Sequence, residues 1–327
     1  MAGTSRRRLL QTGATCAGHL ALASALAPAA ARALWARQPM GRVVRTEPFG
    51  RLEQVAEGVW ALVSTPLGGD RTTLSNGGLI AGRDGVLAVE GFMTPDGARW
   101  LAGQARALTG RWPTHVAITH YHADHATGVA GYRADGARPS VHATGETVAR
   151  VLAALPPTPL PADEARRDAL AQVVAPDGGA AVIDLGGRQV RLVHRRGHTA
   201  SDVSVEVDDP SIVFTGDLVW NGMFPNYVDA IPTALSAAVR GLRRSRTTTY
   251  VPGHGAVAAD ADLARYLEML GEVERAARAA YVRGTSPADA ATAFVLPASL
   301  GEWAMFNTVF FERAFAAWAR ELGAGRG

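Results

Sequence analysis

Apolar and polar positions in the first half of the chain follow two different periods. Residues 52–64 and 77–92 predict short apolar strands joined by glycine-rich turns. Residues 95–110 and 142–155 instead repeat apolar side chains at helical spacing. Between these two stretches, the apolar run 114–120 predicts a buried strand. This half is therefore expected to form strands first and helices afterwards.

The second half repeats that order. A strand-rich stretch runs from about 181 to 217, a helix is predicted at about 233–244, and the run 247–255 predicts another strand. Helical patterns continue from about 260. The repeated order predicts an α+β fold in which two β-sheets pack face to face with helices on the outside.

The last apolar pattern, within residues 300–323, predicts a helix that faces the core. A dimer face, and with it a homodimer, or a cover over a pocket is the alternative for the same side chains. They are Trp303, Phe306, Val309, Phe310 and Trp318.

The stretch 1–33 is typical of an export signal. It has a charged start, an apolar middle and small residues at its end, and the segment 5–10 (SRRRLL) resembles a twin-arginine signal. We therefore predict a cleaved signal and a periplasmic protein, with a retained anchor as the alternative. No later apolar run is long enough to span a bilayer. The single cysteine, Cys16, lies in this signal, so the mature protein is predicted to have neither thiol nor disulfide.

The net charge of +3 does not indicate a nucleic-acid partner. Four of the 33 basic residues lie in the stretch 1–33, which has no acidic residue, so 29 basic residues face 30 acidic ones in the remainder. No basic patch needs explaining, and a small-molecule substrate is expected instead.

The stretch THYHADHATG, residues 119–128, concentrates metal-binding side chains directly after a predicted strand. His120, His122 and Asp124 occupy alternate positions and can converge on one side, while His125 turns in from the loop. Three histidines within six positions, in a chain of nine, indicate a metal site.

Three more polar side chains each follow an apolar strand within a glycine-containing turn. They are His198 in RGHTASD, Asp217 in FTGD and His254 in PGHG. Imidazole and carboxylate are normal zinc ligands, and seven ligands are too many for one tetrahedral ion but suit two. Iron or manganese stays open as the metal. Histidines without a motif are predicted to be ordinary core or surface residues: His115, His142 and His194.

These motifs, in this order, resemble the metallo-β-lactamase-fold hydrolases over roughly residues 52–260. The resemblance implies a four-layer αβ/βα sandwich with two zinc ions at one edge. The matching segments are His120-x-His122-x-Asp124-His125, Gly197-His198-Thr199, Thr215-Gly216-Asp217 and Pro252-Gly253-His254-Gly255.

The same resemblance implies a role for each ligand. Asp124 would also orient an attacking hydroxide and pass protons to the leaving group. The first metal takes His120, His122 and His198; the second takes Asp124, His125 and His254; Asp217 bridges them.

Some residues depart from the family pattern or extend it. Glu90 stands where relatives often have Asp and is expected to support the ligands, as is Asp202, four residues after His198. In having Asp217, the chain resembles the glyoxalase II, lactonase and phosphodiesterase branches of the family. This argues against a dedicated role in destroying antibiotics.

The implied function is that of a dinuclear zinc hydrolase that opens an amide or ester carbonyl with a metal-bridging hydroxide. A β-lactam-like compound or a lactone is the expected substrate. The alternatives are a glyoxalase-II-like thioesterase, a phosphodiesterase, a mononuclear iron persulfide dioxygenase and a non-catalytic metal-binding helper in cofactor handling.

Substrate contacts are expected on loops around the metals. The loop 218–229 is the best candidate, and the segment 64–78 is expected to form the opposite lip. Arg195 and Arg196 are the nearest cations in sequence, but arginines at a strand end are more often solvated. The predicted substrate contacts are Trp220, Asn221, Phe224 and Tyr227.

These predictions divide the 327 residues into four segments. They are an export signal at 1–33, a linker at 34–50, a metallo-hydrolase domain at 51–260 and a C-terminal helical extension at 261–327.

Overall fold

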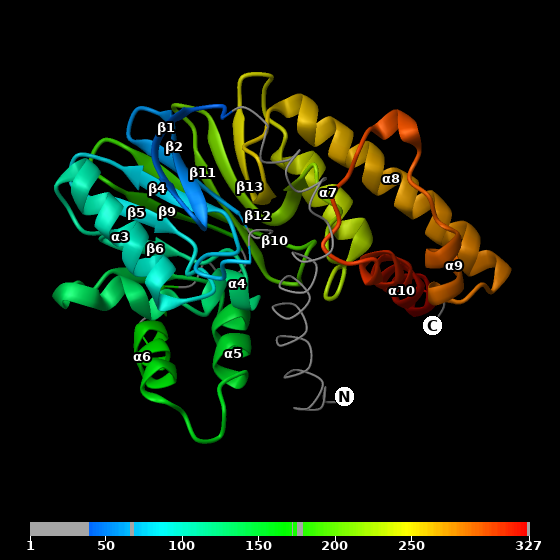
Figure 1. Ribbon diagram of the computed structural model, residues 1–327, viewed down its shortest axis with the longest axis horizontal. Coiled ribbons are helices and arrows are strands. Elements are labelled where there is room, and N and C mark those ends of the chain that lie inside the picture. Colours follow the sequence, from blue (N-terminus) through cyan, green and yellow to red (C-terminus); the bar gives the residue numbers. More distant parts are fainter. Residues whose placement is uncertain (1–38, 66–68, 172, 175–178, 326–327) are drawn as a thin grey trace.

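Two β-sheets lie face to face between outer layers of helices (Figure 1). The computed structural model describes residues 39–65, 69–171, 173–174 and 179–325. The predicted export signal, residues 1–33, lies outside the described residues. None of the described helices is both long enough and apolar enough to cross a membrane.

The first sheet has eight strands in sequence order. Neighbours are antiparallel from β1 to β5 and parallel from β5 to β8. The strands are β1 (Arg42–Glu47), β2 (Gly50–Ala56), β3 (Val59–Ser64), β4 (Gly77–Ala81), β5 (Val86–Val89), β6 (His115–Ala117), β7 (Ser140–His142) and β8 (Val173–Val174).

The second sheet has five strands in the order β13-β12-β11-β10-β9. Only β12 and β13 run parallel, and the other neighbours are antiparallel. The strands are β9 (Ala180–Asp184), β10 (Gln189–Arg195), β11 (Asp202–Val207), β12 (Ile212–Asn221) and β13 (Thr249–Gly255).

Strand β3 shows how the sequence builds the layers. Val59, Ala61 and Val63 face the second sheet and belong to the core between the sheets. Trp60 and Leu62 point the other way, into the core under the outer helices. Because side chains alternate along a strand, a strand that is apolar throughout must be covered on both faces. The predicted α+β sandwich of four layers is confirmed.

Helices cover both outer faces of the sandwich. Those on the first sheet are α3 (Pro95–Thr109), α5 (Gly145–Ala153), α6 (Pro161–Leu170) and the 3-10 turn η2 (Val129–Gly136); the short α4 (Ala123–Ala126) follows β6. Those on the second sheet are α7 (Pro232–Leu242), α8 (Asp260–Arg283), α9 (Pro287–Ala293), η3 (Ala298–Leu300) and α10 (Val309–Ala324).

The linker prediction is wrong where the structure describes it. Residues 42–47 form the edge strand β1, which pairs antiparallel with β2. The pattern of apolar residues in β1 is weak because only one face of the strand meets the core, where Val44 packs. An edge strand of this kind carries too few apolar positions to stand out in the sequence.

Two predicted helices begin later than expected. The stretch 142–155 starts with the end of β7, and Thr144 caps α5 by accepting a hydrogen bond from the backbone N of Thr147 at 3.0 Å. The last helix begins only at Val309, so Trp303 and Phe306 lie in the segment before it. The C-terminal helices share one core with β12 and α7 and are continuous with the sandwich.

A pair of histidines on neighbouring strands makes stability depend on pH. His115 Nδ1 lies 3.1 Å from His142 Nε2, and burial followed by the charge of His115 lowers the pKa of His142 to about 4. Unfolding lets His142 take up a proton between about pH 4 and its ordinary value, so stability is fully present above that window and lost as pH falls through it.

We expect His142→Gln to flatten this pH dependence. The free energy of unfolding of the unmodified protein should fall by up to about 3 kcal/mol more than that of the variant between pH 7.5 and 4. Urea unfolding at several pH values measures the difference, with His194→Gln on β10 as the control. Parallel curves for the unmodified protein and His142→Gln would contradict the assignment.

Candidate metal centre

The structure brings all seven predicted ligands together at one edge of the sandwich. The chain leaves β6 at Ala117, and the loop and α4 that follow present the first four ligands. His198 lies in the turn between β10 and β11, while β12 and β13 supply the others. All seven side chains are buried: His120, His122, Asp124, His125, His198, Asp217 and His254.

The first cluster is formed by three imidazoles and one carboxylate oxygen. His122 Nδ1 lies 3.1 Å from His120 Nε2 and 2.9 Å from His198 Nε2. Asp217 Oδ2 lies 3.3 Å from His198 Nε2 and 3.8 Å from His120 Nε2. Four potential ligand atoms thus surround one point, as a tetrahedral metal site requires.

The second cluster is formed by Asp124, His125 and His254. His254 Nε2 lies 3.3 Å from Asp124 Oδ2 and 3.3 Å from Asp217 Oδ1. His125 Nε2 lies 3.1 Å from the same oxygen of Asp217. One oxygen of Asp217 therefore faces each cluster, which is the geometry of a bridging ligand.

Unsatisfied buried atoms test whether this donor set fits a metal. Asp124 Oδ2, His125 Nε2, Asp217 Oδ1 and His254 Nε2 are buried and have no hydrogen-bond partner among the described residues. Buried polar atoms are otherwise almost always hydrogen-bonded. All four belong to the second cluster or its bridge, so the residues fit a dinuclear metal site.

Burial and nearby carboxylates together set the charge of the ligand histidines, and in the first cluster Asp229 outweighs burial and raises the pKa of His122. Burial lowers the pKa of His198 to about 3 and holds that of His120 well below its usual value, so both rings are neutral, as metal ligands must be. Burial also acts on His254, but Asp217 and Asp124 outweigh it and raise its pKa to about 9. The two carboxylates thus favour positive charge at the second cluster.

Two carboxylates outside the ligand set orient ligand rings. Glu90 Oε1 lies 3.0 Å from His125 Nδ1 and also accepts a hydrogen bond from Thr119 Oγ1 at 2.6 Å, which fits its predicted supporting role. Asp229 Oδ2 lies 2.9 Å from His122 Nε2, and the sequence analysis missed it. The hydrogen bond with Asp229 fixes which nitrogen of His122 faces the metal position.

Asp229→Asn should weaken metal binding at the first cluster. Burial by itself would raise the pKa of Asp229, but the hydrogen bond to His122 and the charge of that ring lower it to about 2. The amide removes the negative charge that pairs with His122. Loss of such a partner typically costs about 10–100-fold in metal affinity. Competition with a chromogenic chelator measures that affinity, with the exposed Asp208→Asn as control. Equal affinity in both variants would remove Asp229 from this role.

Asp202 supports the centre in a different way from the one predicted. Its oxygens accept hydrogen bonds from the backbone N of Thr199, at 3.1 and 3.0 Å, and from Thr199 Oγ1 at 2.7 Å. It therefore fixes the turn that carries His198 and does not contact a histidine ring in these hydrogen bonds.

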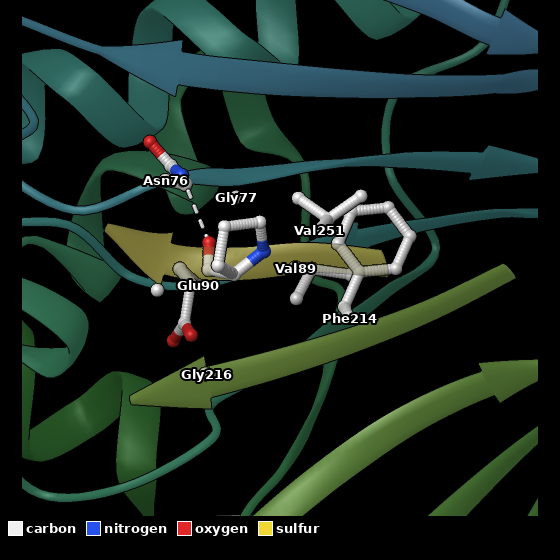
Figure 2. Close-up of a pocket in the computed structure, with 9 residues that line it drawn as sticks. Asn76, Gly77, Val89, Glu90, Phe214, Gly216 and Val251 are labelled. Atoms are coloured by element: carbon white, nitrogen blue, oxygen red, sulfur yellow. Dashed lines mark hydrogen bonds between the residues drawn. The ribbon is translucent and has the colours of Figure 1, made fainter. Parts of the chain in front are cut away.

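Asn76 ties the first sheet to the strand that carries His254, and sequence reasoning gave it no role. Its Nδ2 donates to the carbonyl oxygens of Pro252 at 2.9 Å and Gly255 at 2.8 Å. Its backbone N donates to the carbonyl oxygen of Gly253 at 2.8 Å. Figure 2 shows Asn76 and Glu90 among the residues that line one small space, together with residues of β12 and β13. Backbone groups on both sides of His254 are thus held by one residue.

Asn76→Ala should loosen His254 and destabilise the fold. Two buried carbonyl groups lose a donor, which costs about 1–3 kcal/mol for each. Asn221→Ala is a matched control, because Asn221 Nδ2 donates to the carbonyl oxygens of Ala256 at 3.0 Å and Val257 at 3.5 Å and not to those of Pro252 or Gly255. Calorimetric metal titration should show weaker second-metal binding only in Asn76→Ala, and equal weakening in both variants would contradict this.

A small cavity of about 10 Å³ lies beside the centre, which is room for roughly one water molecule. Among the predicted substrate contacts, only Trp220 lines it, with its ring 4.1 Å from that of His254. The amide of Asn221 serves backbone carbonyls, and Phe224 and Tyr227 pack inside the protein. The cavity is lined by His122, Asp124, Asp217, Trp220, Asn226, His254 and Phe310.

The C-terminal segment provides part of the cavity wall. Phe310 lines the cavity, and Phe306 lies 6.0 Å from His254 between ring centroids. Two backbone hydrogen bonds hold the segment in place, from Phe224 N to Ala304 O at 2.8 Å and from Ala304 N to Gly222 O at 3.0 Å. The pocket-cover alternative for these aromatic residues therefore fits Phe310, which also packs in the core.

Arg195 points away from the metals. Its Nη2 lies 2.7 Å from Glu206 Oε1, and its Nε donates to Ser204 Oγ at 2.7 Å. Arg191 and Arg244 pair with the same glutamate, so this cluster of arginines is balanced by acidic groups. These arginines therefore do not provide a binding site for a polyanionic substrate at the cavity.

Comparison with known proteins identifies the family. The family model described as the metallo-beta-lactamase superfamily matches residues 71–254, which include all seven ligands. The chain belongs to the metallo-β-lactamase superfamily. The sequence is 30% identical over 176 residues to a human protein named acyl-coenzyme A thioesterase MBLAC2, a match over 46% of this chain. The match spans 59% of that relative's length.

Solved structures show that the superfamily fold extends over most of the chain. A sec-alkylsulfatase from Pseudomonas sp. superposes with a TM-score of 0.65 at 15% identity, covering 83% of this chain and 50% of the other. A metallo-beta-lactamase from Pontibacter korlensis superposes with a TM-score of 0.54 at 19% identity, covering 67% of this chain and 98% of the other. At these identities the likeness concerns the fold alone.

Proposed function

We propose that this member of the superfamily is a dinuclear zinc hydrolase that opens the carbonyl of a small ester or amide. The observation that carries the proposal is Asp217, whose two oxygens face the two ligand clusters at 3.1–3.3 Å from His125, His198 and His254. A mononuclear iron dioxygenase would not need the buried second cluster. A non-catalytic helper would not need both clusters intact.

When bound, two metal ions would polarise a carbonyl and make hydroxide available near neutral pH. The residues of the chain provide the surroundings for that reaction. Asp124 faces His254 across the second cluster and is placed to hold and move a proton at Oδ2. Trp220 and Phe310 form an apolar wall that limits access of water.

The shape and charge of the cavity favour a small acyl compound. The wall is partly aromatic, the space is small, and Arg195 is paired with Glu206. A lactone or a β-lactam-like ring is the proposed substrate because each is an activated cyclic carbonyl that hydroxide can open. Thioester hydrolysis is the second candidate, and the human relative named a thioesterase favours it.

The decisive experiment combines metal analysis with a substrate panel. Purified protein should bind two transition-metal ions per chain, with zinc restoring activity after chelation. Turnover should then be compared on a lactone, a penicillin, a carbapenem, an acyl thioester, a secondary alkyl sulfate and a bis-phenyl phosphodiester. Less than one tightly bound ion per chain, or iron with oxygen consumption on a persulfide, would refute the proposal. Fastest turnover of the sulfate or phosphodiester would refute its substrate class.

We also propose that residues 1–33 direct export to the periplasm. The motif SRRRLL and the apolar stretch after it support this. Fractionation of cells that express the full chain, followed by N-terminal sequencing, tests it. Full-length protein confined to the cytoplasm would contradict export.

A further inference from the structure

The helix α5 reaches the surroundings of two ligands of the first cluster, although it carries no ligand and does not line the cavity beside the centre. One line of contacts leads from its first turn to the turn that holds His198. A second line leads from Arg150, in its last turn, to the carboxylate that orients His122. His122 Nδ1 and His198 Nε2 lie 2.9 Å apart, so both lines end at the same metal position.

Buried hydroxyl groups form the line to His198. Thr144, which caps α5, forms hydrogen bonds through its Oγ1 with Ser201 Oγ and, at 3.0 Å, with Thr147 Oγ1. Thr147 Oγ1 also donates to the carbonyl oxygen of Ser201 at 3.4 Å. The backbone N of Ser201 donates to Thr199 Oγ1 at 3.0 Å, and Thr199 directly follows His198 in the chain. The start of α5 is therefore tied to the turn that presents this ligand.

A cation and a phenol form the line to His122. The guanidinium carbon of Arg150 lies 5.2 Å from the centre of the Tyr121 ring. The Tyr121 hydroxyl forms a hydrogen bond with Asp229, and because a carboxylate only accepts, the phenol is the donor. Asp229 Oδ2 in turn lies 2.9 Å from His122 Nε2. The ring of Tyr121 also lies edge-on to that of His122, with 5.1 Å between the centroids.

Both lines hold a ligand ring through groups that have little access to water. Thr144 and Ser201 are buried, and the side chain of Asp229 is 26% exposed. Removal of one member leaves its partner without a hydrogen bond in surroundings where water replaces it poorly. The partners of metal-binding histidines fix the orientation of the rings and thereby set metal affinity. A change in α5 is therefore expected to alter the first metal position.

We propose that α5 positions the first metal site, with Ser201 and Tyr121 as the positioning residues that connect the helix to His198 and His122. This inference rests on the metal centre of the proposed hydrolase. Coupling between two sites is reciprocal, so an ion at the first position stabilises α5 to the extent that α5 favours the ion. A helix that only covered the outer face of the sheet would show no such coupling.

Two substitutions that each remove one hydroxyl test the two lines in the full-length protein, with Co²⁺ as the probe. Ser201→Ala breaks the line to His198, and Tyr121→Phe breaks the line to His122 while keeping the ring beside Arg150. In each variant one of the two stepwise Co²⁺ affinities should fall about three- to tenfold, the worth of one hydrogen bond. Competition with a chelator measures the affinities. The visible absorption of bound Co²⁺, which reports ligand geometry, should change with them.

Each variant has a matched control. Ser211 Oγ also forms a hydrogen bond with a threonine hydroxyl, that of Thr248 at 2.9 Å, so Ser211→Ala is the control for Ser201→Ala. The Tyr250 hydroxyl accepts a hydrogen bond from the backbone N of Arg244 at 3.0 Å, so Tyr250→Phe is the control for Tyr121→Phe. Both controls should keep the affinities and the spectrum of the unmodified protein. Unchanged binding in Ser201→Ala and Tyr121→Phe, or equal weakening in the controls, would overturn the inference.

Hydrogen exchange tests the reciprocal effect. Addition of Co²⁺ should slow the exchange of backbone amides in α5 more than in α9, which packs against α8 and α10 over the second sheet. This added protection of α5 should become smaller in Ser201→Ala and Tyr121→Phe but not in Ser211→Ala or Tyr250→Phe. Equal slowing in α5 and α9 would contradict the coupling. Melting temperatures of the metal-free proteins show whether any variant has lost its fold.

These measurements separate failure of this inference from failure of the proposed function. If the unmodified protein binds two Co²⁺ ions but hydrolyses no member of the substrate panel, the hydrolase proposal fails, and the affinities and exchange rates still decide the role of α5. If hydrolysis occurs and the variants bind Co²⁺ like their controls, only the inference fails. Absence of Co²⁺ binding to the unmodified protein would refute both.

Discussion

Asp217→Asn should abolish paired metal binding, and bound metal should fall from two ions per chain to one or none. Burial by itself would raise the pKa of Asp217, but His254, His125 and His198 hold it well below its usual value. The side chain is therefore a carboxylate, and one of its oxygens faces each cluster. The amide has the same shape but lacks the charge that the two ions share.

The loss of activity in Asp217→Asn should exceed the roughly 100-fold upper end that removal of an orienting partner typically costs. Elemental analysis after dialysis measures bound metal, and steady-state kinetics on the best substrate measures turnover. Asp208→Asn is the matched control because Asp208 is 69% exposed and forms surface ion pairs. Two bound ions with normal turnover in Asp217→Asn would show that the carboxylate does not bridge.

Asp124→Ala should reduce turnover far more than it reduces stability. Asp124 Oδ2 lies 3.3 Å from His254 Nε2 and 3.6 Å from His125 Nε2, and it has no hydrogen-bond partner among the residues that the structure describes. Removal of a group that carries a proton typically costs about 100-fold or more in rate. The sandwich core between the sheets does not contain this residue, so the melting temperature of the metal-loaded protein should change little.

Metal content must be measured together with rate, because Asp124 also belongs to the second cluster. Asp124→Asn separates the two roles, since the amide keeps an oxygen toward the cluster but is a poor proton carrier. Slow turnover with two bound ions in Asp124→Asn would support proton transfer. Unchanged turnover with normal metal content in either variant would remove Asp124 from the mechanism.

The ligands could be predicted from sequence because each lies on an apolar strand or in the segment that follows one. The strand β6 ends at Ala117, so His120 and His122 converge from the loop that follows it and not by alternation along the strand, while the glycine next to His198 or His254 was a correct marker of the position. Such patterns are local, so they can be recognised without knowledge of the tertiary structure. The same is true of the sandwich, whose strands are apolar on both faces.

The residues that support the ligands could not be found in this way. Asp229 is 107 positions from His122, and Asn76 is 176 positions from Pro252. Neither position stands out locally, because their partners are set only by how the two sheets pack. The sequence predicts Asn221 as a substrate contact, whereas Asn226 lines the cavity. Nothing in the local sequence shows which of the two amides faces the cavity.

The backbone bonds between Ala304 and the loop after β12 have a consequence for the order of biosynthesis. Ligands up to His254 are made before the segment 301–310, which supplies Phe306 and Phe310 to the site. During translation the nascent chain thus contains every metal ligand while that wall is still missing. Because β12 packs in one core with α8 and α10, the strand that carries Asp217 completes its packing only after the C-terminal helices have been made.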